Sequence, residues 1–539
     1  MNFKVLISAI LGSVIIVAGC SDETTGGSGG GGGSGGIAEV DCDNLPDLSA
    51  YAVEGAPPTT DEDCTGDIFV PTGDSAPDLN ARLNNADPGD VICLAEGTYN
   101  MSATIKISLV STLTLKGIGD SPDDTVLVFG GPGSGPGIEA SKDDVTIENL
   151  WVKNSGANGI EQSGTSGSVF RKVHVSWDNP CEGSDPPANC DATCTPKLCD
   201  EASDNAGDPC SSSSDCPNGQ CATQDNPCDD ELLACVVDTL TAKEGVCLYD
   251  EGINGAYGIY PTNCQDTTVE YSQASNASDA GIYVGKCGWE DDTTEGGVVH
   301  HNIVNGNVAG LEVENCLGVT VYENLVVDNT GGLMPLSQPG AASETRPSNT
   351  DVLMENNRVW CNNHWNFAKV GVVEIIPAGS GFLMLGGDGI EVRNNDIQGN
   401  DTGGMLIVSN ALTCAAAGAD CPPFDFPEYN PYVENIYIHD NAFTDNGTNA
   451  DQTSDFFIIF DILNMGTPEN PTPDIVWDGF IAEGVTDPNV CLGEDYAGTY
   501  IDLTNDMCGD VANAPEFTGC IAGSNTTSTE GRLCSPSSI

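Results

Sequence analysis

The chain has 539 residues and carries 81 Asp and Glu against 16 Lys and Arg, a formal net charge of −65 at pH 7. That balance excludes nucleic-acid binding as the main function, because affinity for a phosphate backbone comes from Lys and Arg; an anionic membrane surface would also repel the chain. Such a charge is typical of a solvated, self-repelling surface, of a saline habitat or of bound divalent cations.

Residues 1–20 are predicted to be a lipoprotein signal peptide. Lys4 precedes an apolar run over residues 5–18, which is too short to span a bilayer comfortably. The run ends in Val-Ala-Gly-Cys, which resembles a bacterial lipobox whose Cys20 would be lipidated; an ordinary signal peptide is the alternative. Ser21 stands where an Asp would retain such a protein at the inner membrane, which favours the outer membrane or the cell surface.

Residues 21–36 are predicted to be a flexible Gly/Ser-rich linker that lets the folded body stand off the membrane. The chain has 24 cysteines, and 23 remain without Cys20. That number in an exported protein predicts disulfides and at least one unpaired thiol.

Residues 37–180 are predicted to hold an N-terminal cap and the first coils of a β-helix. Within them, residues 77–86 favour a short amphipathic helix that would cover the open end of the β-helix, which is otherwise an exposed sheet edge. Turn-and-strand patterns follow at residues 87–92 and 96–99.

An irregular repeat over residues 142–446 has the form apolar-x-x-Asn-x-x-x-x-Asn. Five copies begin at Val299, Val321, Met354, Val392 and Ile438. Gly281, Gly310 and Gly332 recur at spacings of 29 and 22, about the length of one coil of three short strands. Alternating apolar residues would fill a narrow cylinder, while Asn tolerates the left-handed conformation of a sharp bend and stacks from coil to coil. The repeat predicts an all-β, right-handed parallel β-helix with capped ends; a helical solenoid is disfavoured.

Residues 181–254 interrupt the repeat and are predicted to be a disulfide-stapled insert that splits one coil. Ten cysteines lie between positions 181 and 247, with no CxxC pair, so a zinc module is the weaker alternative. Coils resume over residues 255–450, and residues 451–539 are predicted to form a C-terminal cap region.

The segments SNASDAGIYVGKC, NGNVAGLEVENC and VYENLVVDNTGGLMPL, with GAYGIYP and CNNHWNFAKVG, carry a family resemblance. Over roughly residues 70–450, apart from the insert, the chain resembles the uncharacterised bacterial parallel β-helix repeat-containing lipoproteins, of the pectate-lyase-like group. The resemblance implies the fold and export, but no activity. Residues 333–338 depart from the family's pattern, and the paired Asp arrangement of polygalacturonases is missing.

One candidate site follows from the repeat, because residues two before the first Asn of each copy should face outward in one column. These residues are His300, Tyr322, Glu355, Arg393 and His439. In a catalytic role, His300 or His439 would accept a proton and Arg393 would hold a carboxylate. The alternative is an ordinary polar outer face.

A second candidate stripe follows the glycine turns. It contains Tyr260, Tyr283, Glu312 and Met334, with Lys286 and Glu314 nearby. Exposed tyrosines stack on sugar rings, so the first three and Lys286, together with Tyr322 and Glu355, are predicted to bind substrate. Ordinary cross-strand packing is the alternative.

Cys264, Cys287 and Cys316 each lie six residues after a turn glycine, so they should stack in consecutive coils. Neighbours in that column can form a disulfide, but three cysteines cannot all pair with one another. Cys414 and Cys421 are a further candidate pair.

These patterns favour a cell-surface or outer-membrane protein that recognises or processes polysaccharide. The alternatives are a lyase or epimerase acting on acidic glycans, which would use a cation such as Ca²⁺, and a non-catalytic structural or partner-binding protein. Only five Lys and Arg lie between residues 255 and 445, which counts against direct binding of polyanions. The sequence assigns no metal ligand and no oligomeric state.

Overall fold

The computed structural model describes residues 68–131, 133–178, 254–289, 296–339, 347–368, 371–410 and 429–452, most of 465–503, and short stretches elsewhere, including parts of 40–48. The chain forms two compact units, one of residues 1–176 and 255–539 and one of residues 177–254. In the second unit the described part is an antiparallel pair, β10 (Leu198–Cys199) and β11 (Cys221–Ala222). The predicted signal peptide and linker, with Cys20, and Cys414 and Cys421 lie outside the described residues.

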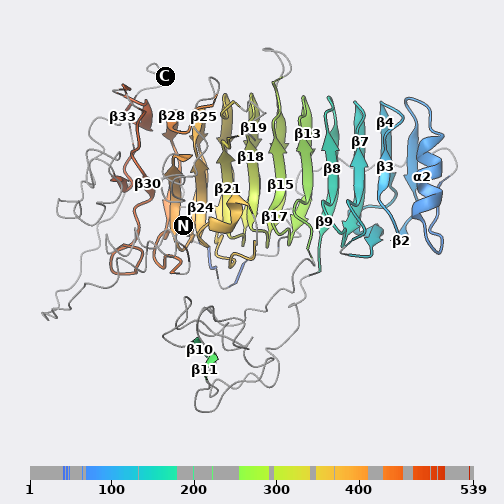
Figure 1. Ribbon diagram of the computed structural model, residues 1–539, viewed down its shortest axis with the longest axis horizontal. Helices are drawn as coiled ribbons and strands as arrows, with labels where there is room; N and C mark the ends of the chain where they lie inside the picture. Colours follow the sequence, from blue (N-terminus) through green and yellow to red (C-terminus); the bar gives the residue numbers. More distant parts are fainter. Residues whose placement is uncertain are drawn as a thin grey trace, which may run out of the picture. The chain divides into compact units, whose positions relative to one another are not determined.

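The first unit is a right-handed parallel β-helix, as predicted. Each coil contributes short strands that pair in parallel with those of the next coil, which builds three rows along the axis (Figure 1). Among the described residues the third row has eleven strands, and we number the coils 1 to 11 by these strands.

The first row consists of β1 (Val91–Leu94), β4 (Leu113–Gly117), β7 (Val145–Lys153), β9 (Val169–Ser176), β13 (Thr267–Glu270), β16 (Gly297–His300), β19 (Val319–Tyr322), β22 (Val352–Glu355), β25 (Gly387–Arg393), β28 (Val433–His439), β31 (Val490–Gly493) and β33 (Leu533–Cys534). The second row consists of β2 (Gly97–Met101), β5 (Thr125–Phe129), the later halves of β7 and β9, β14 (Gln273–Ser275), β17 (Ile303–Asn305), β20 (Leu325–Val327), β23 (Arg358–Trp360), β26 (Asp396–Gln398) and β29 (Ala442–Thr444). The third row consists of β3 (Ile105–Ile107), β6 (Ile138–Ala140), β8 (Ile160–Ser163), β12 (Ile259–Thr262), β15 (Ala280–Gly285), β18 (Ala309–Glu314), β21 (Gly331–Leu336), β24 (Ser380–Leu385), β27 (Gly403–Val408), β30 (Ile475–Trp477) and β32 (Tyr500–Asp502).

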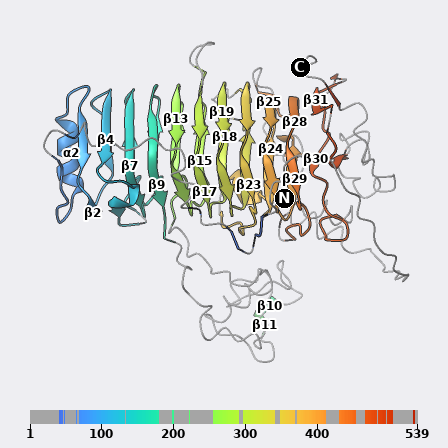
Figure 2. The same ribbon diagram turned by 180° about the vertical axis from the view of Figure 1, so that it is seen from behind.

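Helix α2 (Ala76–Asn84) packs on β3 in the first coil. It buries Ala76, Leu79 and Leu83, and Asn80 fixes it by donating to the Thr104 carbonyl and accepting from the Lys106 amide. Figure 2 shows this helix at one end of the stacked coils, where it covers the sheet edge as predicted. No helix among the described residues has the length and apolar character needed to cross a bilayer.

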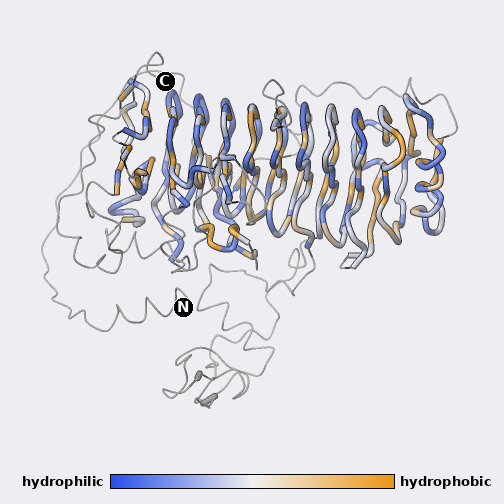
Figure 3. Tube along the Cα trace, turned by 45° about the horizontal axis from the view of Figure 1, so that its top comes forward, coloured by the Kyte–Doolittle hydropathy of each residue, from blue (hydrophilic) through white to orange (hydrophobic). Residues whose placement is uncertain are grey.

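The interior is built from columns of apolar side chains. The repeat positions Val299, Val321, Met354, Val392 and Ile438 pair in register and are at most 1% exposed. Polar and apolar residues alternate along the coils (Figure 3), as expected when one face of each strand points into the cylinder.

Two columns of asparagines, all buried except the partly exposed Asn441, run along the bends of coils 6 to 10. The first contains Asn302, Asn324, Asn357, Asn395 and Asn441; the second contains Asn307, Asn329, Asn362, Asn400 and Asn446. Except for Asn441 and Asn446, which end the columns, each side-chain amide donates to the side-chain oxygen of the Asn in the following coil, which confirms the predicted stacking.

In both Asn columns, however, the left-handed backbone conformation is that of the residue before each Asn and not of the Asn itself. In the first column these residues include His301 at φ 55° and Glu323 at φ 53°. For these ten Asn the expectation that Asn supplies the left-handed bend was therefore wrong, although Asn149 and Asn154 of earlier coils do have left-handed backbones. In the two columns the Asn provides two-sided hydrogen bonding in a buried position.

The cysteine column forms as predicted. Cys264 and Cys287 are disulfide-bonded, while Cys316 is a buried free thiol whose Sγ lies 3.3 Å from the Cys287 amide nitrogen. Among the described pairs, Cys64–Cys93 and Cys42–Cys361 were not predicted.

Candidate functional site

The five predicted outward residues share one column of the first row. His300 pairs with Tyr322, Tyr322 with Glu355, Glu355 with Arg393 and Arg393 with His439, each one coil further along. Each is partly exposed, because the alternation that sends Val299 or Val321 into the core sends its neighbour outward. The predicted register is correct, and the functional roles of these residues remain predictions.

The column also continues toward the N-terminus through residues that sequence reasoning missed. Lys116, Glu148, Arg171 and Glu270 precede His300 in register. They alternate in charge: Lys116 Nζ lies 3.5 Å from Glu148, and Arg171 Nε lies 2.6 Å from Glu270. We call this column, from Lys116 to His439, the outer ladder.

Four aromatic rings meet in the middle of the outer ladder. His300 and Tyr322 are stacked with ring centroids 4.7 Å apart, and His301 is stacked on Tyr271 at 4.8 Å. The two pairs are in contact, since the His300 and His301 centroids are 5.0 Å apart. All four side chains are partly exposed, so the rings form one continuous aromatic surface, which we call the aromatic cluster.

Both imidazoles of the aromatic cluster are held by neighbours. His300 Nε2 lies 3.2 Å from Glu270, and its Nδ1 lies 2.8 Å from Nδ1 of His301. His301 Nε2 in turn lies 2.9 Å from Glu323. Hydrogen bonds from His300 and Arg171 outweigh burial and lower the pKa of Glu270, whereas burial lowers the pKa of His301.

The later end of the outer ladder is a second set of ion pairs. Arg393 lies 2.8 Å from both Glu355 and Glu391, so two carboxylates surround one guanidinium. His439 lies 3.0 Å from Glu391 and 2.6 Å from Asp440. The predicted catalytic groups Arg393, His300 and His439 are therefore already bound to carboxylates of the protein.

The second predicted stripe lies on the third row, where Tyr283 pairs with Glu312 and Glu312 with Met334. Tyr283 is 3% exposed and Glu312 is 2% exposed. The expected exposure of these side chains was wrong, because the rings of Tyr257 and Tyr260 pack against Tyr283 at 5.0 and 4.8 Å. Whether they bind substrate is untested, but neither presents a free face.

The environment of this buried stripe perturbs its carboxyl groups. Burial raises the pKa of Asp279 to about 7, against an opposing hydrogen bond with Tyr257. Burial, and then the charges of Asp279 and Glu314, raise the pKa of Glu312 well above its ordinary value. One oxygen each of Asp279 and Glu312 is buried without a hydrogen-bond partner. A pKa of about 7 lets Asp279 keep a proton close to neutral pH, and raised pKa values of this kind occur both in general acids and in carboxyls buried for structural reasons.

The remaining residues of the stripe contribute differently. Lys286 has a left-handed backbone just beyond Gly285 and is half-buried, and its amide donates to the Glu314 carbonyl. Met334 begins an apolar stretch of the third-row outer face. Leu336, Leu385 and Val408 continue this stretch and, with Val372 and Ile375 of the 3₁₀ helix η6 (Val372–Ile375), line a small apolar cavity.

Asp279 and Tyr257 were also missed as members of the stripe, although Asp279 directly precedes the predicted turn at Gly281. No group of three or more His, Cys, Asp or Glu side chains among the described residues is arranged to hold a metal ion.

Comparisons with known proteins agree with the fold. The family model for the right-handed β-helix region matches residues 251–421. No curated protein matches the chain in sequence.

Solved structures with a similar fold include three polysaccharide-active enzymes. The A-module of the mannuronan C-5 epimerase AlgE6 of Azotobacter vinelandii has 11% identity and a TM-score of 0.42, covering 75% of this chain and 76% of the epimerase module. An alginate lyase of Paenibacillus sp. has 14% identity and a TM-score of 0.34, covering 70% of this chain and 94% of the lyase. Pectate lyase Pel9A has 10% identity and a TM-score of 0.35, covering 70% of this chain and 76% of the pectate lyase. At these identities the likeness concerns the fold alone.

Proposed function

We propose that the chain recognises a glycan on the outer face of the first row, at the aromatic cluster. The observation that carries the proposal is the continuous, partly exposed surface formed by Tyr271, His300, His301 and Tyr322. Aromatic faces stack on the apolar faces of sugar rings, and coils about 4.8 Å apart offer successive rings along an extended chain.

The charges around the aromatic cluster favour a neutral glycan over an acidic one. An acidic sugar would have to displace Glu355 or Glu391 from Arg393, or Glu270 from Arg171. Exposed carboxylates such as Glu323 and Asp440 add repulsion. These contacts support recognition more than catalysis, since both nitrogens of His300 already have partners.

We also propose that the protein works at the cell surface or the outer membrane, with Cys20 as its lipid anchor. The lipobox-like sequence at residues 17–20 and the disulfides Cys42–Cys361, Cys64–Cys93 and Cys264–Cys287 support export, because disulfides persist in oxidising compartments.

A glycan array tests the proposal, with neutral oligosaccharides, oligogalacturonates and alginate oligomers on one surface. The wild-type chain should be retained on a neutral glycan, and Tyr322→Ala should lower the affinity about tenfold, the loss expected for one stacked ring. Thr320→Ala is the matched control, because Thr320 is partly exposed on the same strand, β19, outside the aromatic cluster. Retention of no glycan, or equal retention of both variants, would refute the proposal.

A lyase or epimerase acting on an acidic glycan is the second candidate. The raised pKa values of Asp279 and Glu312 favour it, because a carboxyl whose pKa is raised toward neutrality is suited to general acid catalysis. This version predicts ultraviolet-absorbing unsaturated products, or epimerised sugars, from a uronate polymer, and loss of both in Glu312→Gln. A wild-type chain that leaves uronate polymers unchanged, with and without added Ca²⁺, contradicts it.

A further inference from the structure

An N-terminal segment lies against the side of the later coils, although it is hundreds of residues away from them in the sequence. Val40, Leu45 and Leu48 pack on a buried apolar patch of the second row. The patch consists of Ile303, Leu325, Val327, Trp360 and Cys361, from coils 6 to 8. We call the described residues between 40 and 48 the strap.

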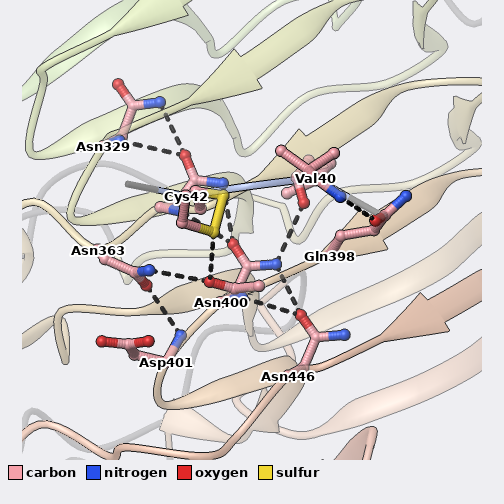
Figure 4. The surroundings of a disulfide bond; sticks show 12 residues. Val40, Cys42, Asn329, Asn363, Gln398, Asn400, Asp401 and Asn446 are labelled. Atoms are coloured by element: carbon pink, nitrogen blue, oxygen red, sulfur yellow. Dashed lines mark hydrogen bonds between the residues drawn. A yellow bond between two sulfur atoms is a disulfide. The ribbon is translucent and has the colours of Figure 1, made fainter. Parts of the chain in front are cut away.

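Two bonds hold the strap in place, beside its apolar packing (Figure 4). Cys42 is disulfide-bonded to Cys361 across 319 residues of sequence. The Val40 amide donates to Oε1 of Gln398, a residue of coil 9. A side chain at Gly399 would collide with the disulfide, because its Cβ would lie 2.4 Å from Cys42 Sγ. Glycine at position 399 therefore leaves the space that the disulfide occupies.

The two ends of the N-terminal region are fixed to different coils. Cys42 is bonded to Cys361 in coil 8, whereas Cys64 is bonded to Cys93 of β1 in coil 1. Seven coils at about 4.8 Å each separate the two attachment points by about 35 Å. As long as the Cys42–Cys361 bond is intact, anything joined to the chain before residue 40 is attached at the side of the later coils.

This disulfide has the most exposed cysteine of the described pairs. Cys42 is exposed, whereas Cys64 is only partly exposed and Cys264 and Cys287 are at most 1% exposed. A dithiol reductant therefore reaches Cys42 first, since exchange requires access to a sulfur atom. Two electrons and two protons pass to the protein: the Cys42–Cys361 bond breaks, two thiols form, and the reductant's own thiols close into a disulfide.

We propose that the strap is a redox-sensitive latch. Reduction of Cys42–Cys361 releases residues 40–48, uncovers the apolar patch around Trp360, and moves the attachment of the N-terminal tether from coil 8 to coil 1. Beside the disulfide, the described residues of the strap are held by apolar packing of Val40, Leu45 and Leu48 and by the Val40 amide, and a segment held by such local contacts opens more easily once its covalent link is gone.

Hydrogen exchange read by mass spectrometry tests the latch on the full-length protein. Amides of residues 40–48 should exchange slowly in the oxidised protein and at least about tenfold faster after mild dithiol treatment. The same acceleration is expected in Cys42→Ser without reductant. Cys64→Ser/Cys93→Ser is the control: it removes a disulfide of coil 1 and should leave residues 40–48 protected.

A hydrophobic dye gives an independent measurement, because exposure of Ile303, Leu325, Val327 and Trp360 should raise dye binding in reduced but not in oxidised protein. Continued protection of residues 40–48 in both the reduced protein and Cys42→Ser would overturn the proposal, since packing alone would then hold the strap. Fast exchange of these amides in the oxidised protein would overturn it equally.

Discussion

His300 and Tyr322 occupy the same column of adjacent coils, and their rings are stacked with planes 8° apart. The stack exists because Asn302 and Asn324 fix the bends behind the two strands and hold the coils in register. The buried Asn column thus positions the exposed aromatic cluster. Substitutions in the Asn column should lower stability, whereas substitutions in the aromatic cluster should lower glycan binding.

Asn357→Ala should lower the free energy of unfolding by about 2–4 kcal/mol, because several buried groups lose partners. The Asn357 amide donates to the Val321 carbonyl and to Asn395, and its oxygen accepts from Asn324. Thermal or urea unfolding measures the loss. Thr320→Ala, in the neighbouring coil, should change stability by less than about 0.5 kcal/mol. Equal stability of Asn357→Ala and wild type would contradict the role given to the ladder.

Asp279→Asn should reduce the pH dependence of stability. The folded state keeps the Asp279 proton up to a pKa of about 7, whereas an unfolded Asp loses it near pH 4. The folded state therefore binds more protons in this window, and stability falls as pH rises from about 4 to about 7. Asparagine carries no charge, so the variant should gain at most about 4 kcal/mol relative to wild type over this range.

Urea unfolding of both proteins at pH 4, 5.5 and 7 measures this difference in unfolding free energy. Asp266→Asn, at an exposed position, serves as the control and should follow the wild-type curve. A stability difference between Asp279→Asn and wild type that stays constant with pH would show that Asp279 has an ordinary pKa.

Cys316 should resist alkylation in the folded protein. Burial raises the pKa of its thiol to about 12, so almost no thiolate is present at pH 8, and the sulfur is 0% exposed. Peptide mapping after iodoacetamide treatment should find Cys316 unmodified in native protein and modified in urea. Rapid labelling of native protein would place Cys316 outside the column.

Gly285→Ala should destabilise the buried tyrosine stripe by about 1–3 kcal/mol. A Cβ at position 285 would lie 2.1–2.3 Å from atoms of the Tyr283 ring, which is held by its aromatic neighbours. In a Tyr283→Ala background the same change should cost little, because the ring that collides is gone. Additive effects of the two substitutions in unfolding experiments would argue against this contact.

The sequence predicted the parts of the fold that depend on local periodicity. The apolar-x-x-Asn spacing set the register of His300, Tyr322 and Arg393 correctly, because each copy keeps the interior residue and the ladder Asn. The earlier half of the column was missed at Glu270, because Ser272 stands where the repeat would have its first Asn, so the segment does not match the pattern. The Ser272 amide still donates to the Asn302 side chain.

Burial on the outer face could not be predicted in the same way. Whether Tyr283 or Glu312 is exposed depends on which side chains lie over the strand, and Tyr257 comes from the previous coil. The link between Cys42 and Cys361 spans 319 residues without any repeat to indicate it. Such contacts follow from tertiary packing, for which the repeat carries no signal.

Hydrogen exchange in the presence of a bound neutral glycan tests the central claim most directly, because it locates the binding surface without substitutions. The account predicts added protection in peptides covering residues 268–272, 298–302 and 320–323, where the aromatic cluster lies. Protection confined to residues 257–262, 279–286 and 310–314 would contradict it and place recognition on the third row, at the buried tyrosines and carboxyls.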